Sequence, residues 1–535
     1  MSIVRINSEF FNNDAQTNFN SRTHANPGLD VHVVATSATN ILLEGIRGTG
    51  KTHILKMIRE ESLRTFKRNR ILPIYISLAK ISEYESLDDE IFRVHLYTNI
   101  VQAAFSTIIE NSSYIEDSDS PLSLKILRSE APIFELFKEQ SISEVLEEVE
   151  KLFTRLNSEL LTSNLKISGE QSNGVKGELG FKGISLSGEM TTKEQIEYVL
   201  GRLSHYNASR YIVEFFKGLH NILELNYSLI LIDEISGVSD KAQLEVFRLL
   251  RLIRASTETA EGTNFLYFIG SVYPPQKTNY PSKTKGDELE FIPGEDCSME
   301  YLEMDVLGEE YEAFFKYITE RRLLTLHPES EGNILWLFED EKTFLLAAFA
   351  ANGLPRRYFE IIKAAYVSAA KKFTTQKEVQ RIDYSSISSA IQTIIDSQTL
   401  NENQLTESDL YFLDKIIIPK LSARNTGAET RNENREEDRR LPVHLFLSVS
   451  RSDRKKLGTL IYRGVIHNLS RTRKSKSILS EDQEQRGIMM MLDLAVAINY
   501  RVFNIQKAVE YFQNDLRENA RKGYPYFSDI SLPDN

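Results

Sequence analysis

The stretch "NILLEGIRGTGKTHILKMIREE", Asn40 to Glu61, decides the fold. A short apolar run leads into a glycine-rich turn, and apolar residues at helical spacing follow the turn. Gly45 to Thr52 satisfies G-x-x-x-x-G-K-[S/T] at every fixed position, in the strand–turn–helix context that this pattern requires. The alternative is a glycine-rich turn that precedes a helix by chance, and the complete motif in this context disfavours it. The stretch therefore predicts an α/β sheet whose first turn binds the phosphates of a nucleoside triphosphate.

Each residue type in this turn suits the binding of phosphate. Glycines let backbone N–H groups face the β- and γ-phosphates, and the N-terminus of the following helix favours their negative charge. We expect Lys51 to reach the phosphates and the Thr52 hydroxyl to ligate Mg²⁺. The residues predicted to contact the nucleotide are Gly45, Ile46, Arg47, Gly48, Thr49, Gly50, Lys51, Thr52 and His53.

A second apolar run, "YSLILIDEIS", ends in two acids and supplies the partner of the phosphate-binding turn. Leu229 to Ile232 is continuously apolar, which is typical of a central parallel strand buried on both faces. We expect Asp233 to hold Mg²⁺ through water, and Glu234 to orient and deprotonate the attacking water. The alternative is an acidic strand end that caps the next helix. The intact turn upstream favours the catalytic interpretation.

A third apolar run, "NFLYFIGSVYPP", predicts the next core strand and ends in Gly270-Ser271. At the tip of that strand, Ser271 is expected to lie near the γ-phosphate, whereas Asn264 at the far end is a poorer candidate. Strands often end in serine because the residue favours turns. Nucleotide sensing by Ser271 and a role in the turn therefore both stay open.

The composition is that of a globular protein with several domains. The chain has 535 residues, of which 41% are hydrophobic and 26% charged. Its formal net charge of −12 argues against a protein that coats nucleic acid over its whole surface, and leaves a local basic patch open. Cys297, the single cysteine, excludes an internal disulfide and a thiolate zinc site. With a polar N-terminus and no apolar run of membrane-spanning length, we expect a cytoplasmic protein without a membrane partner.

A helical region follows the predicted core. The stretch "FLLAAFAANGLPRRYFEIIKAAYVSAAKKF" predicts two helices joined at Asn352-Gly353-Leu354-Pro355. Pro355 suits the first position of a helix, where a missing N–H costs nothing. Arg356 then lies in the first turn of that helix, pointing back toward the junction.

Four features together resemble an AAA+ ATPase of the origin-recognition (ORC/CDC)-like initiator group, with its prokaryotic and signalling (STAND) relatives. They are the P-loop, the acidic strand, the polar residue at the end of the next strand, and the Gly-Leu-Pro-Arg turn of a helical lid. The resemblance covers residues 40–111 and 196–372. It implies ATP and Mg²⁺ as cofactors, ATP hydrolysis and a homo-oligomer. It also implies that Arg356 contacts the γ-phosphate, with Arg357 as the alternative.

ATPases of this family complete the site with an arginine from a neighbouring subunit, worth about 10³–10⁵ in rate. Three arginines at a spacing of three form one stripe of a predicted helix, "EVFRLLRLIRAS". A solvated or acid-paired helix face explains the stripe equally well, so the assignment stays open. The candidates are Arg248, Arg251, Arg254, Arg321 and Arg322.

The spacing of the motifs predicts the domain organisation. We expect an N-terminal arm at 1–35, an AAA+ core at 36–306, a helical lid at 307–400 and a C-terminal domain at 401–535. Residues 112–195 exceed what a βαβ crossover needs, and predict an inserted helix and a β-hairpin that turns at Asn173-Gly174. Such an insertion either contacts DNA, a substrate or the next subunit, or is a surface hairpin without a task.

The C-terminal domain has the outline of a winged helix, which the initiator-type family carries after its lid. Residues 422–440 are mixed in charge and nearly free of apolar side chains, so we expect a flexible loop. A short helix, a break at Gly464, a strand, the basic turn "RTRKSKS" and a second strand follow. Winged helices also bind proteins, and a solvated basic turn is the other alternative. The residues predicted to contact DNA are Arg454, Lys455, Lys456, Arg471, Arg473, Lys474 and Lys476.

Two functions follow from this organisation. The first is an ATPase that couples nucleotide-dependent assembly to DNA or partner binding; family analogy adds a role in anti-phage defence. The alternative is a signalling switch in which ATP gates an effector protein and DNA plays no part. A vestigial scaffold is disfavoured because Lys51, Thr52, Asp233 and Glu234 are all present.

Overall fold

We describe the protein from a computed structural model of the full chain. Its described residues form two compact units. The first, here called the sheet unit, comprises Leu29–Glu44 and Lys51–Tyr301; the second, the lid unit, comprises Met1–Gly28, Gly45–Gly50 and Leu302–Asn535. The residues that the structure describes are 6–12, 15, 19–23, 29–84, 89–116, 151–152, 205–256, 264–275, 277–287, 289–372, 381–401, 405–433, 440–473 and 487–533.

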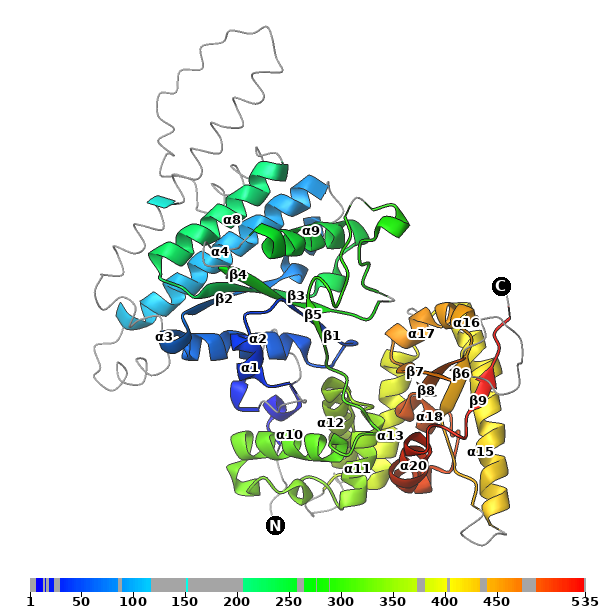
Figure 1. The fold of residues 1–535 in the computed structure, drawn as a ribbon. Coiled ribbons are helices and arrows are strands. Elements are labelled where there is room, and N and C mark those ends of the chain that lie inside the picture. Colours follow the sequence, from blue (N-terminus) through cyan, green and yellow to red (C-terminus); the bar gives the residue numbers. More distant parts are fainter. Residues whose placement is uncertain are drawn as a thin grey trace. The chain divides into compact units, whose positions relative to one another are not determined.

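The sheet unit is built on five parallel strands in the order β2-β3-β4-β1-β5 (Figure 1). The P-loop follows β1, the acids end β3, and β4 lies between these two strands. This arrangement confirms the predicted α/β fold with an AAA+-type P-loop core. The strands are β1 (Ile41–Glu44), β2 (Ile71–Ser77), β3 (Tyr227–Asp233), β4 (Leu266–Val272) and β5 (Ser298–Tyr301).

Helices cover both faces of this sheet. In Figure 1, α4, α8 and α9 lie over one face, and α1 and α2 lie on the other. All seven residues of β3 are buried, as expected for a strand covered on both sides. The helices are α1 (Val31–Thr36), α2 (Lys51–Arg64), α3 (Phe66–Asn69), α4 (Asp89–Glu116), α8 (His205–Ile222) and α9 (Asp240–Ser256).

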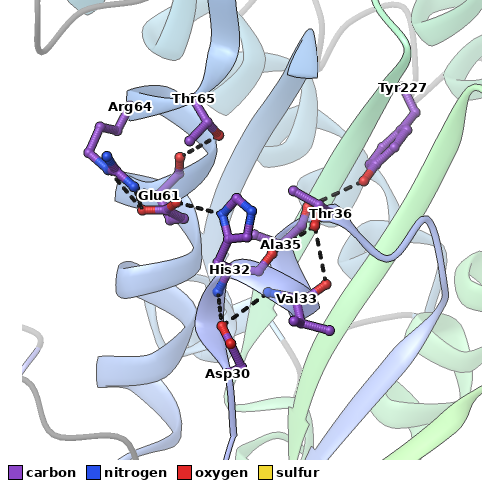
Figure 2. A network of polar contacts seen from close by, with 9 residues as sticks. All are labelled: Asp30, His32, Val33, Ala35, Thr36, Glu61, Arg64, Thr65 and Tyr227. Atoms are coloured by element: carbon purple, nitrogen blue, oxygen red, sulfur yellow. Dashed lines mark hydrogen bonds and ion pairs between the residues drawn. The ribbon is translucent and has the colours of Figure 1, made fainter. Parts of the chain in front are cut away.

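Polar contacts connect the short helix α1 to the P-loop helix α2 and to β3 (Figure 2). Asp30 caps α1 by accepting from the backbone N–H of His32 at 2.9 Å, a contact worth about 1 kcal/mol. The His32 ring lies 2.8 Å from Glu61 Oε1 on α2, and Tyr227 of β3 donates to the Ala35 carbonyl at 3.3 Å. These contacts fix the segment that leads into β1.

The lid unit combines a helical bundle with a four-stranded sheet in the order β7-β8-β6-β9. β8 pairs antiparallel with both β6 and β7, and β9 pairs parallel with β6. The longer helices are α10 (Tyr311–Leu326), α11 (Glu341–Ala350), α12 (Pro355–Lys372), α13 (Tyr384–Ile394) and α15 (Ile418–Asn432). The shorter helices are α14 (Glu407–Tyr411), α16 (Arg451–Lys456), α17 (Gly458–Tyr462), α18 (Leu494–Asn499), α19 (Ala508–Glu510) and α20 (Arg517–Arg521). The strands are β6 (Phe446–Val449), β7 (Ile466–Arg473), β8 (Gly487–Leu492) and β9 (Ser528–Ile530).

One hydrophobic core joins the lid helices to the C-terminal sheet. Phe344 of α11 and Tyr358 of α12 belong to the same buried cluster as Leu447 of β6 and Met490 of β8. Phe10, from the N-terminal segment, is fully buried in this cluster as well. Part of the expected arm thus packs in one body with the lid and the C-terminal domain, whereas residues 29–35 of that arm belong to the sheet unit.

The prediction of a flexible loop over residues 422–440 is wrong for its first part, because α15 continues through Asn432. Its few apolar side chains are supplemented by the side-chain amides of Asn425, which is buried, and Asn432, which is partly buried. Asn425 pairs with both backbone groups of His444, and Asn432 pairs with both backbone groups of Leu441. The prediction of a loop rested on the lack of apolar residues, and hydrogen bonds from side-chain amides are not visible in that pattern. Residues 434–439 lie outside the described residues.

The predicted insertion, 112–195, falls mostly outside the described residues, including its hairpin turn at 173–174. At its start, α4 continues to Glu116. Leu152 is described and buried in the core of the sheet unit, against Gly218 of α8. Among the helices that the structure describes, none has the length and apolar character needed to cross a bilayer.

Candidate functional site

The two acids lie at the carboxyl end of β3, where ligands of open α/β sheets bind. Asp233 is buried, and its Oδ1 accepts from the Ser271 hydroxyl at 2.6 Å and from the Glu234 N–H at 3.0 Å. Glu234 adopts a left-handed backbone conformation, with φ of 64°, which is uncommon for a residue with a side chain. Such local strain is typical of functional sites.

Lys51 reaches the same edge of the sheet. It begins α2, and its Nζ lies 4.3 Å from the centre of the Tyr273 ring, which directly follows β4. β4 is also the neighbour of the acidic strand, with Gly270 opposite Ile232. The amino group predicted to bind phosphate and the predicted acids thus lie along neighbouring strand ends.

The oxygen donors at this edge fit the chemistry of Mg²⁺, which prefers carboxylate and hydroxyl oxygens and keeps several waters. Thr52 is the second residue of α2, and His53 follows it in the same turn. The Asp233 carboxylate already has both oxygens held by protein donors, as a ligand in an oriented site requires. Thr52 and Asp233 therefore remain the residues predicted to hold the metal.

Ser271 is fully buried, and its hydroxyl is engaged by the acidic strand. It donates to Asp233 and accepts from the Glu234 N–H at 2.8 Å. Ser271 therefore holds the Asp233 carboxylate and the Glu234 backbone. Its contact with a phosphate stays a prediction.

The turn Gly45–Gly50 packs within the lid unit. Gly48 has φ of 98° and Gly50 has φ of 93°, backbone conformations that favour glycine. Inside the turn, the Thr49 hydroxyl donates to the Ile46 carbonyl at 3.0 Å, and the Ile46 N–H donates to Glu303 at 3.3 Å. The positive φ values thus explain why the motif has glycine at positions 48 and 50, and the binding of phosphate by this turn stays a prediction.

The Gly-Leu-Pro-Arg turn adjoins this loop. The Arg356 N–H donates to the Gly48 carbonyl at 3.4 Å, so the predicted γ-phosphate residue begins beside the P-loop turn. Gly353 has φ of 83°, and a Cβ there would approach the Met304 carbonyl oxygen to 2.5 Å. Only glycine fits that position, and it sets the direction in which α12 leaves the turn.

Arg357, the alternative contact for the γ-phosphate, is buried and bound elsewhere. Its guanidinium donates to Asp493 Oδ2 at 2.5 Å, and the His467 Nε2 lies 2.9 Å from the same oxygen. Asp493 Oδ1 caps α18 by accepting from two backbone N–H groups. Although burial opposes ionisation, Arg357 and His467 hold the pKa of Asp493 below its ordinary value. This arrangement favours Arg356 for the γ-phosphate.

Glu360 is a further acid near the turn whose pKa is changed by burial. Glu360 lies one helical turn beyond Arg356 on α12. Burial raises the pKa of Glu360 above its ordinary value, against the lowering effect of Arg356, Arg357 and Arg47. The predicted nucleotide-contacting Arg47 therefore lies within electrostatic reach of the lid helix.

Most arginines considered for action in a neighbouring subunit have partners within the chain. Arg248 pairs with Glu245, and Arg254 pairs with Asp296. Arg322 is buried over the Phe359 ring at 3.6 Å, and burial lowers its pKa to about 10. Arg251 donates to the Glu290 carbonyl, and Arg321 lies 5.8 Å from the Tyr317 ring. The acid-paired interpretation thus accounts for Arg248 and Arg254.

The predicted DNA contacts divide into three groups. Arg454, Lys455 and Lys456 occupy the last turn of α16, where Lys456 also binds the carbonyls of Leu532 and Pro533 at 3.3 and 3.0 Å. Arg471 and Arg473 belong to β7, which pairs antiparallel with β8. Lys474 and Lys476 lie outside the described residues.

Sequence reasoning missed two side chains on β2. The Tyr75 hydroxyl donates to Asp233 Oδ2 at 3.0 Å, and the Ser77 hydroxyl lies 3.4 Å from Glu234 Oε2. Tyr75 and Ser77 alternate with Ile74 and Ile76 at the carboxyl end of this strand. Polar residues at that spacing share one face of a strand, so the pattern was a usable signal.

Comparison with known proteins adds a family likeness. Residues 32–188 match the family model described as ORC-CDC6-like, a segment that includes the P-loop and β2. No curated protein matches the chain. Among solved structures, the chain is similar to the Aeropyrum pernix ORC2 protein (ADPNP-ADP complexes), with 11% identity, a TM-score of 0.35 and 93% of each chain covered. It is also similar to the Aeropyrum pernix ORC1 protein in complex with DNA, with 14% identity, a TM-score of 0.31, and 88% of this chain and 91% of that chain covered. At such TM-scores, the fold assignment rests on the strand order and the P-loop.

Proposed function

We propose that this protein is an ORC/CDC6-like AAA+ ATPase that binds ATP with Mg²⁺ and hydrolyses it to ADP and phosphate. The carrying observation is the buried Asp233 carboxylate, held by Ser271 at the strand edge that Lys51 also reaches. The family match over residues 32–188 supports the same function. Because the fold alone does not imply function, the proposal rests on these side chains.

The residues divide the work of hydrolysis. Lys51 and the backbone N–H groups of the turn bind and orient the β- and γ-phosphates. Thr52 and Asp233 hold Mg²⁺, which when bound neutralises charge on the phosphate oxygens. Glu234 takes the proton of the attacking water at its carboxylate, and Ser271 and the Glu234 N–H keep the neighbouring acid in place. Arg356 stabilises charge that develops on the γ-phosphate.

Two variants test this function. Lys51→Ala should lose nucleotide binding, measured with a fluorescent ATP analogue. Glu234→Gln should bind the analogue as the wild type does and lose turnover by at least about a hundredfold, within the range of general-base catalysis. Equal turnover in the wild type and Glu234→Gln would remove the catalytic assignment.

We further propose that ATP drives assembly of a homo-oligomer and that the C-terminal part acts as a winged helix on DNA. The basic last turn of α16 and the antiparallel β7–β8 pair support this reading. A role in anti-phage defence, and the alternative of a switch that gates an effector protein, rest on the family resemblance alone. The mass of ATP-loaded Glu234→Gln, measured with and without DNA, separates the DNA-binding function from the switch. A complex that forms only with DNA favours the DNA-binding function. A complex that needs ATP and is the same with and without DNA favours the switch.

A further inference from the structure

The two oxygens of the Asp233 carboxylate are held by different parts of the sheet. Oδ1 accepts from Ser271 of β4 and from the neighbouring backbone N–H of Glu234. Oδ2 accepts from the Tyr75 hydroxyl of β2 at 3.0 Å. Tyr75 therefore holds the carboxylate from the side opposite to β4, because β3 lies between β2 and β4.

The position of Tyr75 is set by the strand register. Tyr75 lies opposite Leu231 on β3, and Ser77 lies opposite Asp233 itself. The ring reaches forward along the strands to the acid, and the Lys56 amino group of α2 lies 5.8 Å from its centre. The phenol thus extends from β2 to the acid, with the Lys56 amino group of α2 near its ring.

The phenol is suited to remain a donor. The Tyr75 side chain is partly buried at the carboxyl end of β2, and its hydroxyl is the group that donates to Asp233 Oδ2. A neutral phenol that donates to a carboxylate fixes its rotation, as the hydrogen-bond partners of metal-ligating carboxylates do.

We propose that Tyr75 is a positioning residue that orients the Asp233 carboxylate for Mg²⁺. The inference rests on the proposed function and adds a residue to it. The bonds from Ser271 and the Glu234 N–H both reach Oδ1 and leave the carboxylate free to pivot about that oxygen. The bond from Tyr75 to Oδ2 removes this freedom in the absence of the metal. Loss of a hydrogen bond of this kind typically costs about 10–100-fold in metal affinity.

Tyr75→Phe is the test, because it removes the hydroxyl and keeps the ring that Lys56 approaches. The affinity for a fluorescent ATP analogue is measured in EDTA and at several Mg²⁺ concentrations. We expect unchanged affinity in EDTA, because the P-loop is untouched, and a Mg²⁺ midpoint raised about tenfold. Turnover at saturating Mg²⁺ should recover most of the wild-type rate.

Tyr227→Phe is the matched control. It removes a phenol from the same sheet, whose hydroxyl bonds the Ala35 carbonyl and no acid. This control should keep the wild-type Mg²⁺ midpoint, and thermal melting of both variants separates a Mg²⁺ effect from a loss of fold.

The outcomes are distinguishable. A wild-type protein that binds no nucleotide under any condition overturns the proposed function and this inference with it. A wild type that responds to Mg²⁺ while Tyr75→Phe keeps the same midpoint, or gains a lower one, overturns the inference alone. An equal shift in Tyr227→Phe overturns it as well, because the effect then belongs to the fold and not to the contact with Asp233.

Discussion

The Arg357 guanidinium lies 2.5 Å from Asp493 Oδ2, across 136 positions of the sequence. Arg357 lies on α12 directly after Arg356, whose backbone N–H donates to the P-loop residue Gly48. Asp493 is the N-cap of α18 and directly follows β8 of the C-terminal sheet. One helix start thus contacts the P-loop turn through one residue and the C-terminal sheet through the next.

This pair should be essential for the stability of the lid unit. Arg357→Met should lower the free energy of unfolding by about 3–5 kcal/mol, because it leaves the Asp493 charge buried with only His467 opposite it. Urea unfolding measures the change. Lys522→Met is the control, since its pair with Glu518 is exposed, and it should cost less than about 1 kcal/mol. Equal effects of the two substitutions would contradict the prediction.

His444 should make the protein less stable in mild acid. Burial, followed by the charge of Arg424, lowers the pKa of His444 from 6.5 to about 4. In the unfolded chain His444 takes up a proton near pH 6.5, whereas in the folded protein it does so only near pH 4. The free energy of unfolding therefore falls as the pH drops from 6.5 to 4. The full loss is on the order of 3 kcal/mol.

Unfolding by urea at a series of pH values tests this linkage. His444→Leu removes the titrating group, so between pH 6.5 and 4 its stability should fall less steeply than that of the wild type. The test compares the slopes of the free energy of unfolding against pH, because the substitution can also change the absolute stability. Parallel curves for the two proteins would refute the role of His444.

Asn425 should hold α15 in place. Its side chain is fully buried and exchanges two hydrogen bonds with the His444 backbone, at 3.0 and 3.1 Å. Asn425→Ala leaves two buried backbone groups unpaired, at about 1–3 kcal/mol each. Amide hydrogen exchange should show loss of protection along α15. Asn432→Ala removes the same pair of bonds from the partly exposed Leu441, where water replaces them, and should cost less.

DNA binding should depend on salt through particular residues of α16. If Arg454 and Lys455 each pair with a phosphate, substituting either with Ala lowers the slope of log K against log salt by about 0.9. Lys456→Ala should leave the slope unchanged, because its amino group is bound to the carbonyls of Leu532 and Pro533. Identical slopes in all three variants and the wild type would remove α16 from the DNA interface.

The P-loop, the acidic strand and the lid turn were all predictable from the sequence. Each depends on local requirements: Gly48 and Gly353 adopt positive φ, Pro355 begins a helix, and the apolar run before Asp233 forms a buried strand. Backbone conformations of this kind are set by residues within a few positions of one another. The sequence therefore determined the fold class and the positions of the motifs, and the nucleotide-binding and catalytic roles of their residues stay predictions.

Only the tertiary structure decided what several polar side chains do. Arg357 was a candidate for the γ-phosphate, and the fold buries it against Asp493. The sequence assigns no role to Tyr75, and the strand register places its hydroxyl on an acid 158 positions away. The sequence predicts a loop over residues 422–432, but the Asn425 side chain bonds the His444 backbone next to β6 and this segment is helical. A polar group is recognisable from its neighbours in the chain, but its partner is chosen by packing, because a buried donor or acceptor must be satisfied by whatever the folded chain brings to it.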